Sequence, residues 1–160
     1  MDVRKPLVRP AVPQEAPVLV RLINDAFIVE SFFKIGDRTS ADEIRQMMHA
    51  GEFFVLEEAR GAIAGCVYAT FQGERAYFGM LSVDPTEQGR GFGRHLIDAV
   101  EARARERGCR HLDIHIVNLR EELPGFYRRL GYVDCGTLPF SDTARASRPC
   151  HFIVMTKTLA

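Results

Sequence analysis

A glycine-rich turn that runs into a helical pattern is the part of this sequence best suited to chemistry. The stretch from Leu81 to Leu96 reads LSVDPTEQGRGFGRHL. An apolar strand pattern leads into Gly89, Gly91 and Gly93, and the apolar spacing then becomes helical. The first amides of a helix have no intrahelical acceptor, and the helix dipole adds partial positive charge there. Because glycines carry no Cβ, a ligand's phosphates can approach the backbone, so the stretch predicts a diphosphate site.

The spacing of the glycines and the charge of the neighbouring arginines limit which diphosphate ligand the turn could bind. Arg90 and Arg94 add positive charge on the rim of the predicted turn. A dinucleotide fingerprint beginning at Gly89 needs a third glycine where Arg94 stands, and the G-x-x-x-x-G-K-[ST] phosphate loop is absent. The structural alternative is a turn in which the glycines only join a strand to a helix. The sequence therefore excludes the two commonest nucleotide loops without excluding another phosphate ligand.

Composition describes an ordinary globular protein. The 160 residues predict a single domain, residues 1–160, large enough to form its own core. The formal net charge of zero argues against binding to nucleic acid. The four cysteines are scattered, without C-x-x-C or histidine at ligand spacing, so we expect reduced thiols and no metal. No apolar stretch is long enough for a leader or a membrane span, so we expect a cytoplasmic protein.

The elements that must position the turn follow from hydrophobic periodicity. The first half of the chain predicts a short strand at residues 7–9, a helix from Gln14, and a second helix capped by Ser40 and Glu43. Strands are predicted at residues 53–57, 63–71 and 77–83, with turns between them, as in an antiparallel meander. The glycine-rich turn thus follows the last strand of the meander.

The second half of the chain alternates helices and strands. A helix is predicted after Gly91, then a strand at residues 112–116, a short helix ending at Gly131, and strands at residues 132–137 and 152–155. Strand, helix and strand form a right-handed crossover, so the strands on either side of the long helix should be parallel neighbours. We predict an α/β (α+β) fold with a mixed, mostly antiparallel sheet of about seven strands and helices on both faces.

The spacing of Gln88, Gly91 and Gly93 after Leu-x-Val-x-Pro resembles the acetyl-CoA signature of the GCN5-related N-acetyltransferase (GNAT) family. The resemblance implies acetyl-CoA as co-substrate, without a metal. It also implies that the end of the strand and the turn bind the cofactor, through Leu81, Ser82, Val83, Gln88, Gly89, Arg90, Gly91, Phe92, Gly93 and Arg94. Backbone N–H groups near Leu81 to Val83, where the family's strand is bulged, are then expected to stabilise the thioester oxygen.

A second segment, Phe126-Tyr127-x-x-x-Gly131-Tyr132, is similar to the same family. The resemblance implies that Tyr127 lies near the CoA sulfur, contacts the cofactor and protonates the departing thiolate. Without the upstream turn, a core aromatic would be the better interpretation of Tyr127. Asn118, nine residues earlier, stands two positions from the asparagine that family members often carry, and we include it among the cofactor-binding candidates.

The sequence offers several candidates for the general base and does not decide between them. Many relatives carry a glutamate on the strand matching residues 77–83, but this strand has no carboxylate before Asp84, whose place beside proline suits a turn. His115 is the first candidate, with Asp113 two residues earlier on the same strand face. Glu30 and His151 are further candidates, and a water chain without a dedicated base is an equal alternative.

Two unpatterned segments, residues 28–39 and 139–149, are expected to line the acceptor site. Phe32, Phe33 and Phe140 could hold an apolar body, and Glu30 could hold a cation; a lid that packs on itself is the alternative. We therefore predict transfer of an acetyl group directly to a primary amine of a small molecule or peptide. The remaining alternatives are a non-catalytic acyl-CoA-binding module and a thioester hydrolase. Among partners we allow for a homodimer and expect neither nucleic acid nor a membrane.

Overall fold

The structure is a computed structural model that describes residues 6–140 and 142–159. It contains seven strands, four α-helices and four short 3-10 turns. The strands are β1 (Leu7–Pro10), β2 (Glu52–Glu57), β3 (Ile63–Gln72), β4 (Arg75–Val83), β5 (His111–Val117), β6 (Val133–Pro139) and β7 (His151–Thr158). The helices are α1 (Ala16–Ala26), α2 (Ala41–Ala50), α3 (Phe92–Glu106) and α4 (Leu123–Arg129), and the turns are η1 (Pro13–Glu15), η2 (Phe27–Glu30), η3 (Pro85–Glu87) and η4 (Thr143–Arg145).

All seven strands form one sheet in the order β1-β2-β3-β4-β5-β7-β6. Every neighbouring pair is antiparallel except β4 and β5, which are parallel and are joined by α3. The mixed sheet and the parallel pair confirm the fold class that hydrophobic periodicity predicted. The parallel pair matters for the site because it divides the sheet into two halves.

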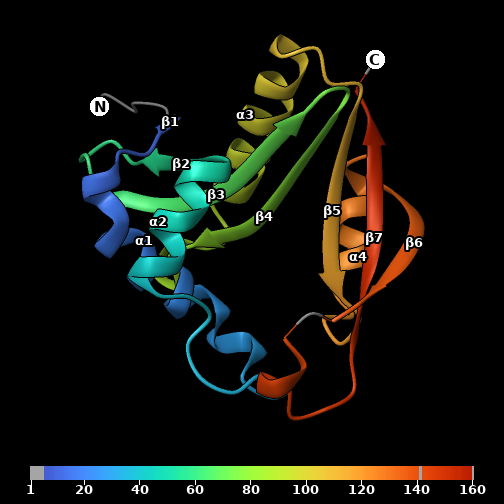
Figure 1. Cartoon of the computed structure of the whole chain (residues 1–160). Helices are drawn as coiled ribbons and strands as arrows, with labels where there is room; N and C mark the ends of the chain where they lie inside the picture. Colours follow the sequence, from blue (N-terminus) through green and yellow to red (C-terminus); the bar gives the residue numbers. More distant parts are fainter. Residues whose placement is uncertain (1–5, 141, 160) are drawn as a thin grey trace.

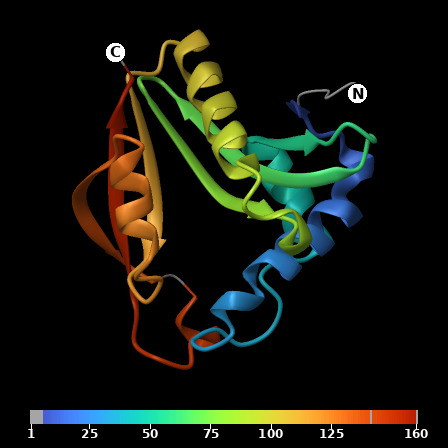
Figure 2. The same cartoon turned by 180° about the vertical axis from the view of Figure 1, so that it is seen from behind.

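Helices cover both faces of the sheet, with α1 and α2 on one face and α3 and α4 on the other (Figures 1 and 2). The side under α3 and α4 holds the larger core, which includes Leu96, Ile97, Tyr127 and Tyr132. A second core packs α1 and α2 against the other face of β2 and β3. Because a packed core lies on each face of the sheet, two neighbouring strands can separate at one place while both cores stay intact.

That opening lies between β4 and β5. The two strands pair only from Arg75 to Tyr77 on β4 and from His111 to Asp113 on β5, and beyond this point they diverge (Figure 1). On the other side of β4 the register with β3 shifts between Cys66 and Tyr68. Opposite this shift Met80 has a φ of 54°, a left-handed conformation that is uncommon for a side chain other than glycine. The bulge bends β4 away from β5.

The starts of two predicted helices differ in detail from the structure. The helix that carries Tyr127 begins at Leu123, slightly before the predicted start near Pro124. Ser40 does cap α2, since its Oγ accepts from the amide of Glu43 at 3.2 Å. Glu43, however, accepts a 2.6 Å bond from the Thr39 hydroxyl instead of closing the capping box.

Among the described residues no helix is long and apolar enough to span a membrane.

Candidate active site

A cavity of about 590 Å³ occupies the space where β4 and β5 diverge. Its walls include residues 77–81 of β4 and residues 114–117 of β5, and beyond the last pair, Tyr77 with Asp113, these parts of the two strands do not pair with each other. The rest comes from η2 and the loop after it, from α2, from α4 and the segment before it, from the loop that follows β6, and from Phe152 on β7. We call this space the acceptor cavity. Its position follows from the bulge, because strands that stayed paired would leave no room between them.

A second cavity, of about 540 Å³, lies along the glycine-rich turn and the start of α3. We call it the turn cavity. Most of the residues predicted to bind the cofactor line it: Leu81, Val83, Gln88, Gly89, Gly91, Phe92, Gly93 and Arg94. Four predicted residues do not line it: Ser82, Arg90, Asn118 and Tyr127, of which the last two are described below. Ser82 is buried and donates its hydroxyl to the carbonyl of Met80, and Arg90 is exposed and pairs with Glu87.

The turn cavity has the features of an anion site. Gly91 caps α3 with a φ of 78°, and no side chain caps the helix there. The helical hydrogen bonds begin with the amide of His95, so within the described chain the amides of residues 92–94 have no acceptor. A Cβ added at Gly89 or Gly91 would meet no described atom within 4 Å, and one at Gly93 would meet only Val83 at 3.9 Å. Free amides, the helix dipole and open space above the glycines fit a diphosphate.

The two cavities are neighbours that share part of their lining. Both are lined by Leu81, just after the bulge of β4, and by Leu123 and Phe126 of α4. Phe27 and Arg120 also line both cavities. A ligand in the turn cavity can therefore extend along Leu81 and present its end to a second ligand in the acceptor cavity. This arrangement suits transfer of a group between two bound molecules.

Tyr127 lies beside this junction, on the wall of the acceptor cavity. It is buried, and its ring packs against the rings of Phe78, Phe126 and Tyr132 with centroids 5.0 to 6.1 Å apart. Burial raises the pKa of the Tyr127 hydroxyl well above its usual value. The phenol therefore stays protonated at neutral pH, which is the state that can give a proton to a leaving group.

His115 also lines the acceptor cavity, where its ring lies between two aromatic rings. The centroid of Tyr77 is 4.8 Å away and that of Phe152 is 5.7 Å away. Desolvation lowers the pKa of the imidazole, and the charge of Asp113 opposes this shift. A pKa below the ordinary value keeps the ring neutral at pH 7, so His115 can accept a proton.

Several other predicted residues have partners elsewhere. Asp113 forms a 2.7 Å ion pair with Arg75, and it does not line the acceptor cavity. The Asn118 side chain accepts from the amide of His151 at 2.9 Å, and neither residue lines either cavity. Asp84 accepts from the amide and hydroxyl of Thr86, which fits the turn role expected for it. A contact between Asn118 and a cofactor stays a prediction.

The two unpatterned segments lie against each other, as expected for walls of one site. Lys34 forms an isolated antiparallel bridge with Ala146, and the amide of Ile35 donates to the carbonyl of Arg145 at 2.7 Å. Their aromatic residues divide into two groups. Phe140 lines the acceptor cavity, whereas Phe33 is fully buried among Val117 and Phe140, and Phe32 packs on Phe33 at 4.8 Å. Glu30 lines the cavity but is ion-paired to Arg120 at 2.9 Å.

Several residues that line the cavity were not named as site residues from the sequence: Phe27, Lys34, Arg38, Glu43, Tyr77, Arg120, Leu123 and Asp142. Phe126 was named only as part of the segment that resembles the family. Lys34 and Arg38 fall in a segment that was expected to line the site, so their charge was the available signal. Glu43 was assigned to helix capping alone. Tyr77 belongs to the strand of residues 77–83, on which no carboxylate was found before Asp84, and it lines the cavity together with residues 78–81. Among the described residues, no cluster of His, Cys, Asp and Glu could hold a metal.

The fold and the site define an α/β protein with an anion-binding turn beside a second cavity at a splayed parallel strand pair. Residues 20–132 match the model of the acetyltransferase (GNAT) family, so the chain belongs to this family. The match covers the strand, turn and helix of the turn cavity as well as Tyr127. It confirms the family that the glycine spacing indicated.

Comparison with individual proteins agrees with this family. The chain is 35% identical over 88 residues to acetyltransferase YE1169 of Yersinia enterocolitica, a segment that covers 55% of this chain and 62% of that protein. Its fold is similar to the Escherichia coli ribosomal-protein-S18-alanine N-acetyltransferase, with a TM-score of 0.79 and 16% identity over 98% of this chain and 95% of that one. It is also similar to yncA of Salmonella typhimurium, solved with its cofactor acetyl-CoA, with a TM-score of 0.73 and 18% identity over 98% and 95% of the two chains.

Proposed function

We propose that this protein is an N-acetyltransferase that binds acetyl-CoA in the turn cavity and transfers its acetyl group directly to an amine in the acceptor cavity. The single observation that carries the proposal is the junction of the two cavities at Leu81, Leu123 and Phe126, with Tyr127 beside it. Membership of the GNAT family supports the cofactor. The diphosphate would lie on the free amides of residues 92–94, and the pantetheine arm would run along the end of β4.

The acetyl group would reach the junction, where the bulge of β4 lies. The register shift opposite Val67 leaves Met80 and Leu81 outside the regular pairing of β3 and β4. Backbone N–H groups at such a bulge are suited to hold the thioester oxygen as negative charge develops on it. This oxygen-binding role is part of the proposal, and it depends on the left-handed conformation of Met80.

In the reaction, the neutral amine nitrogen attacks the thioester carbon, a C–N bond forms and the C–S bond breaks. The amine must lose a proton, and His115 is the proposed acceptor because its imidazole faces the same cavity and its pKa is lowered. The departing sulfur gains a proton, and Tyr127 is the proposed donor because burial keeps its phenol protonated. The product amide and free CoA then leave through their separate cavities.

Direct transfer agrees with the positions of the thiols. Cys66 is fully buried, and burial raises the pKa of its thiol to about 12, so it cannot serve as a thiolate near neutral pH. Cys109 is also buried, and neither Cys135 nor Cys150 lines the turn cavity or the acceptor cavity. The described residues therefore offer no cysteine to carry the acetyl group between the two ligands.

The test is release of CoA thiol from acetyl-CoA in the presence of a broad panel of primary amines. We expect release that depends on at least one amine and saturates with it. If acetyl-CoA binds but no amine causes release, the protein is instead a non-catalytic acyl-CoA-binding module. Release at the same rate without any amine would indicate a thioester hydrolase.

A further inference from the structure

Two cations line the acceptor cavity without a close anionic partner. The Lys34 side chain is half-buried, and no described residue forms a hydrogen bond or an ion pair within 4.0 Å with its ammonium. Its Nζ lies 5.9 Å from the centre of the Phe140 ring. Arg38 is also half-buried, and its guanidinium lies 5.2 Å from the centre of the Phe27 ring. Among the described residues its only ion pair is a loose one, in which its guanidinium lies 4.0 Å from the carboxylate of Glu43.

The carboxylates of the same cavity are already engaged. Glu30 is paired with Arg120 at 2.9 Å, and Glu43 accepts the Thr39 hydroxyl at 2.6 Å. Asp142 lies 3.7 Å from Arg145. The formal charges that line the cavity cancel. The carboxylates, however, already have close partners, whereas Lys34 and Arg38 can still donate hydrogen bonds to a ligand. Desolvation is the main cause that lowers the pKa of Lys34; the charges of Arg38 and Arg145 lower it further, and those of Glu30 and Asp142 raise it.

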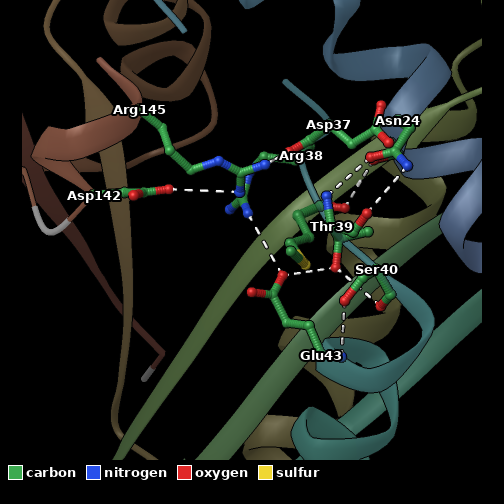
Figure 3. Close-up of polar contacts among 10 residues, drawn as sticks. Asn24, Asp37, Arg38, Thr39, Ser40, Glu43, Asp142 and Arg145 are labelled. Carbon is green, nitrogen blue, oxygen red and sulfur yellow. Dashed lines mark hydrogen bonds and ion pairs between the residues drawn. The ribbon is translucent and has the colours of Figure 1, made fainter. Parts of the chain in front are cut away.

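The backbone around both cations is fixed before any ligand binds. The Asn24 side chain holds Thr39 through two bonds, accepting from its amide at 2.9 Å and donating to its carbonyl at 3.2 Å. On the other side, Arg145 donates to the carbonyl of Asp37 at 2.8 Å. Figure 3 shows Arg38 between these two anchors, with Asn24 and Thr39 on one side and Arg145 and Asp142 on the other. Lys34 is fixed by its backbone bridge to Ala146.

We propose that Lys34 and Arg38 form a carboxylate-binding subsite, and that the acceptor is an amine that carries a carboxylate. This inference rests on the proposed function and names the class of its substrate. The planar fork of Arg38 matches a carboxylate, and the Lys34 ammonium adds a point charge. A monoanion fits better than a dianion, because Glu30, Glu43 and Asp142 line the same space and would repel a second negative charge. A protein N-terminus, which has no carboxylate next to its amine, would leave the subsite unused.

The experiment compares L-amino acids with their own carboxamides as acceptors, using acetyl-CoA and thiol release. We expect the wild-type protein to prefer an amino acid to its amide in kcat/KM, although the amine of the amide loses its proton more readily. Lys34→Met keeps most of the side-chain volume and removes the charge. It should lower kcat/KM for the amino acid about 10- to 100-fold more than for the amide, the effect of losing a charge-assisted hydrogen bond. Arg38→Lys should cause a smaller loss in the same direction, because lysine cannot form the fork.

Arg148→Met is the matched control. Arg148 belongs to the neighbouring loop and lies over Phe32, but it does not line the acceptor cavity, so its removal should leave the preference unchanged. Equal use of acids and amides by the wild-type protein would overturn the subsite while leaving the proposed function intact. A preference for amines that carry a phosphonate would also overturn the choice of a carboxylate. Failure to acetylate any amine would overturn the proposed function itself.

Discussion

Glu30 and Arg120 lie 90 positions apart in the sequence and form an ion pair in which Nη1 of Arg120 is 2.9 Å from Oε2 of Glu30. The side chains are only 7% and 16% exposed. Glu30 ends η2, and Arg120 lies between β5 and α4 and lines both cavities. The pair therefore ties the wall of the acceptor cavity to the segment that leads into the helix of Tyr127.

Removing one partner should destabilise the protein, because the other charge would stay buried without compensation. For Arg120→Met we expect a loss of about 3 kcal/mol, the lower end of the range for breaking a buried pair, since Arg120 keeps some exposure. In a domain of this size the melting temperature should fall by roughly 6–12 °C. Adding Glu30→Gln to Arg120→Met should restore part of this loss. Arg128→Met, which breaks an exposed pair with Asp134, should change stability by about 0–1 kcal/mol. Equal losses from the two arginine variants would contradict the account.

Gly93→Glu should abolish stabilisation by acetyl-CoA while leaving the fold intact. Gly93 has no left-handed φ, and an added Cβ would only touch Val83, so the new side chain would enter the space proposed for the diphosphate. For the wild-type protein, ligand at about a hundredfold its dissociation constant should add about 2.7 kcal/mol of stability, which thermal denaturation can measure. NAD and ATP should stabilise far less.

The control for this variant is Gly136→Glu. Gly136 lies on β6, the last strand of the sheet, where an added Cβ meets no described atom within 4 Å. It should keep the full shift with acetyl-CoA. Gly91→Glu is less informative, because the positive φ of Gly91 would add backbone strain to the loss of the ligand. A Gly93→Glu protein that still binds acetyl-CoA normally would place the cofactor elsewhere.

His115→Gln should lower turnover about 10²–10⁴-fold if the imidazole accepts the amine proton. Since desolvation lowers its pKa, the imidazole is neutral at pH 7 and becomes protonated only below its ordinary pKa of about 6.5. The kcat/KM of the wild-type protein should therefore fall as the pH falls through a value below about 6.5, and the variant should lack this acidic limb. His49→Gln, in the exposed last turn of α2, is the control. A limb that persists in His115→Gln would assign the proton to water or another group.

Tyr127→Phe and Tyr68→Phe should separate catalysis from stability. Tyr127→Phe keeps the ring packing and removes the proton donor, so turnover should fall about 10²–10⁴-fold while acetyl-CoA affinity changes little. Because burial raises the pKa of Tyr127, the wild-type rate should not fall until the pH is above about 10. Tyr68 donates to the carbonyl of Met47 at 2.9 Å in the other core, so Tyr68→Phe should cost about 1 kcal/mol without slowing turnover. Full activity in Tyr127→Phe would return Tyr127 to a purely structural role.

Local patterns predicted the parts of the fold and the site that local sequence controls. The alternation from His111 to Ile116 and the apolar spacing of α3 sufficed for a parallel β4–β5 pair. Gly91 and Gly93 lie where their spacing indicated, along the turn cavity. These features depend on residues that are close in the chain, so hydrophobic periodicity and the positions of glycines can predict them.

Contacts between segments that are distant in the chain could not be predicted from the sequence. Nothing in the residues around Glu30 indicates that Arg120 neutralises it, and so a role in holding a cation was expected for a carboxylate that is already paired. Glu43 matches a capping box, yet its carboxylate lines the acceptor cavity and accepts a hydrogen bond from the hydroxyl of Thr39. Asn118 and His151 close the end of β5 against β7 through two hydrogen bonds, a pairing that only the sheet order reveals.

Transfer of a deuterated acetyl group from acetyl-CoA tests the central claim most directly. After reaction with an amine that stimulates thiol release, mass spectrometry should find the intact deuterated acetyl group on the amine. It should find one acetylated amine for each CoA released and no label on the protein. We expect this result because the two cavities share Leu81 and Phe126, and no described cysteine lines either cavity. Label recovered as free acetate, or held on a protein side chain during turnover, would contradict direct transfer.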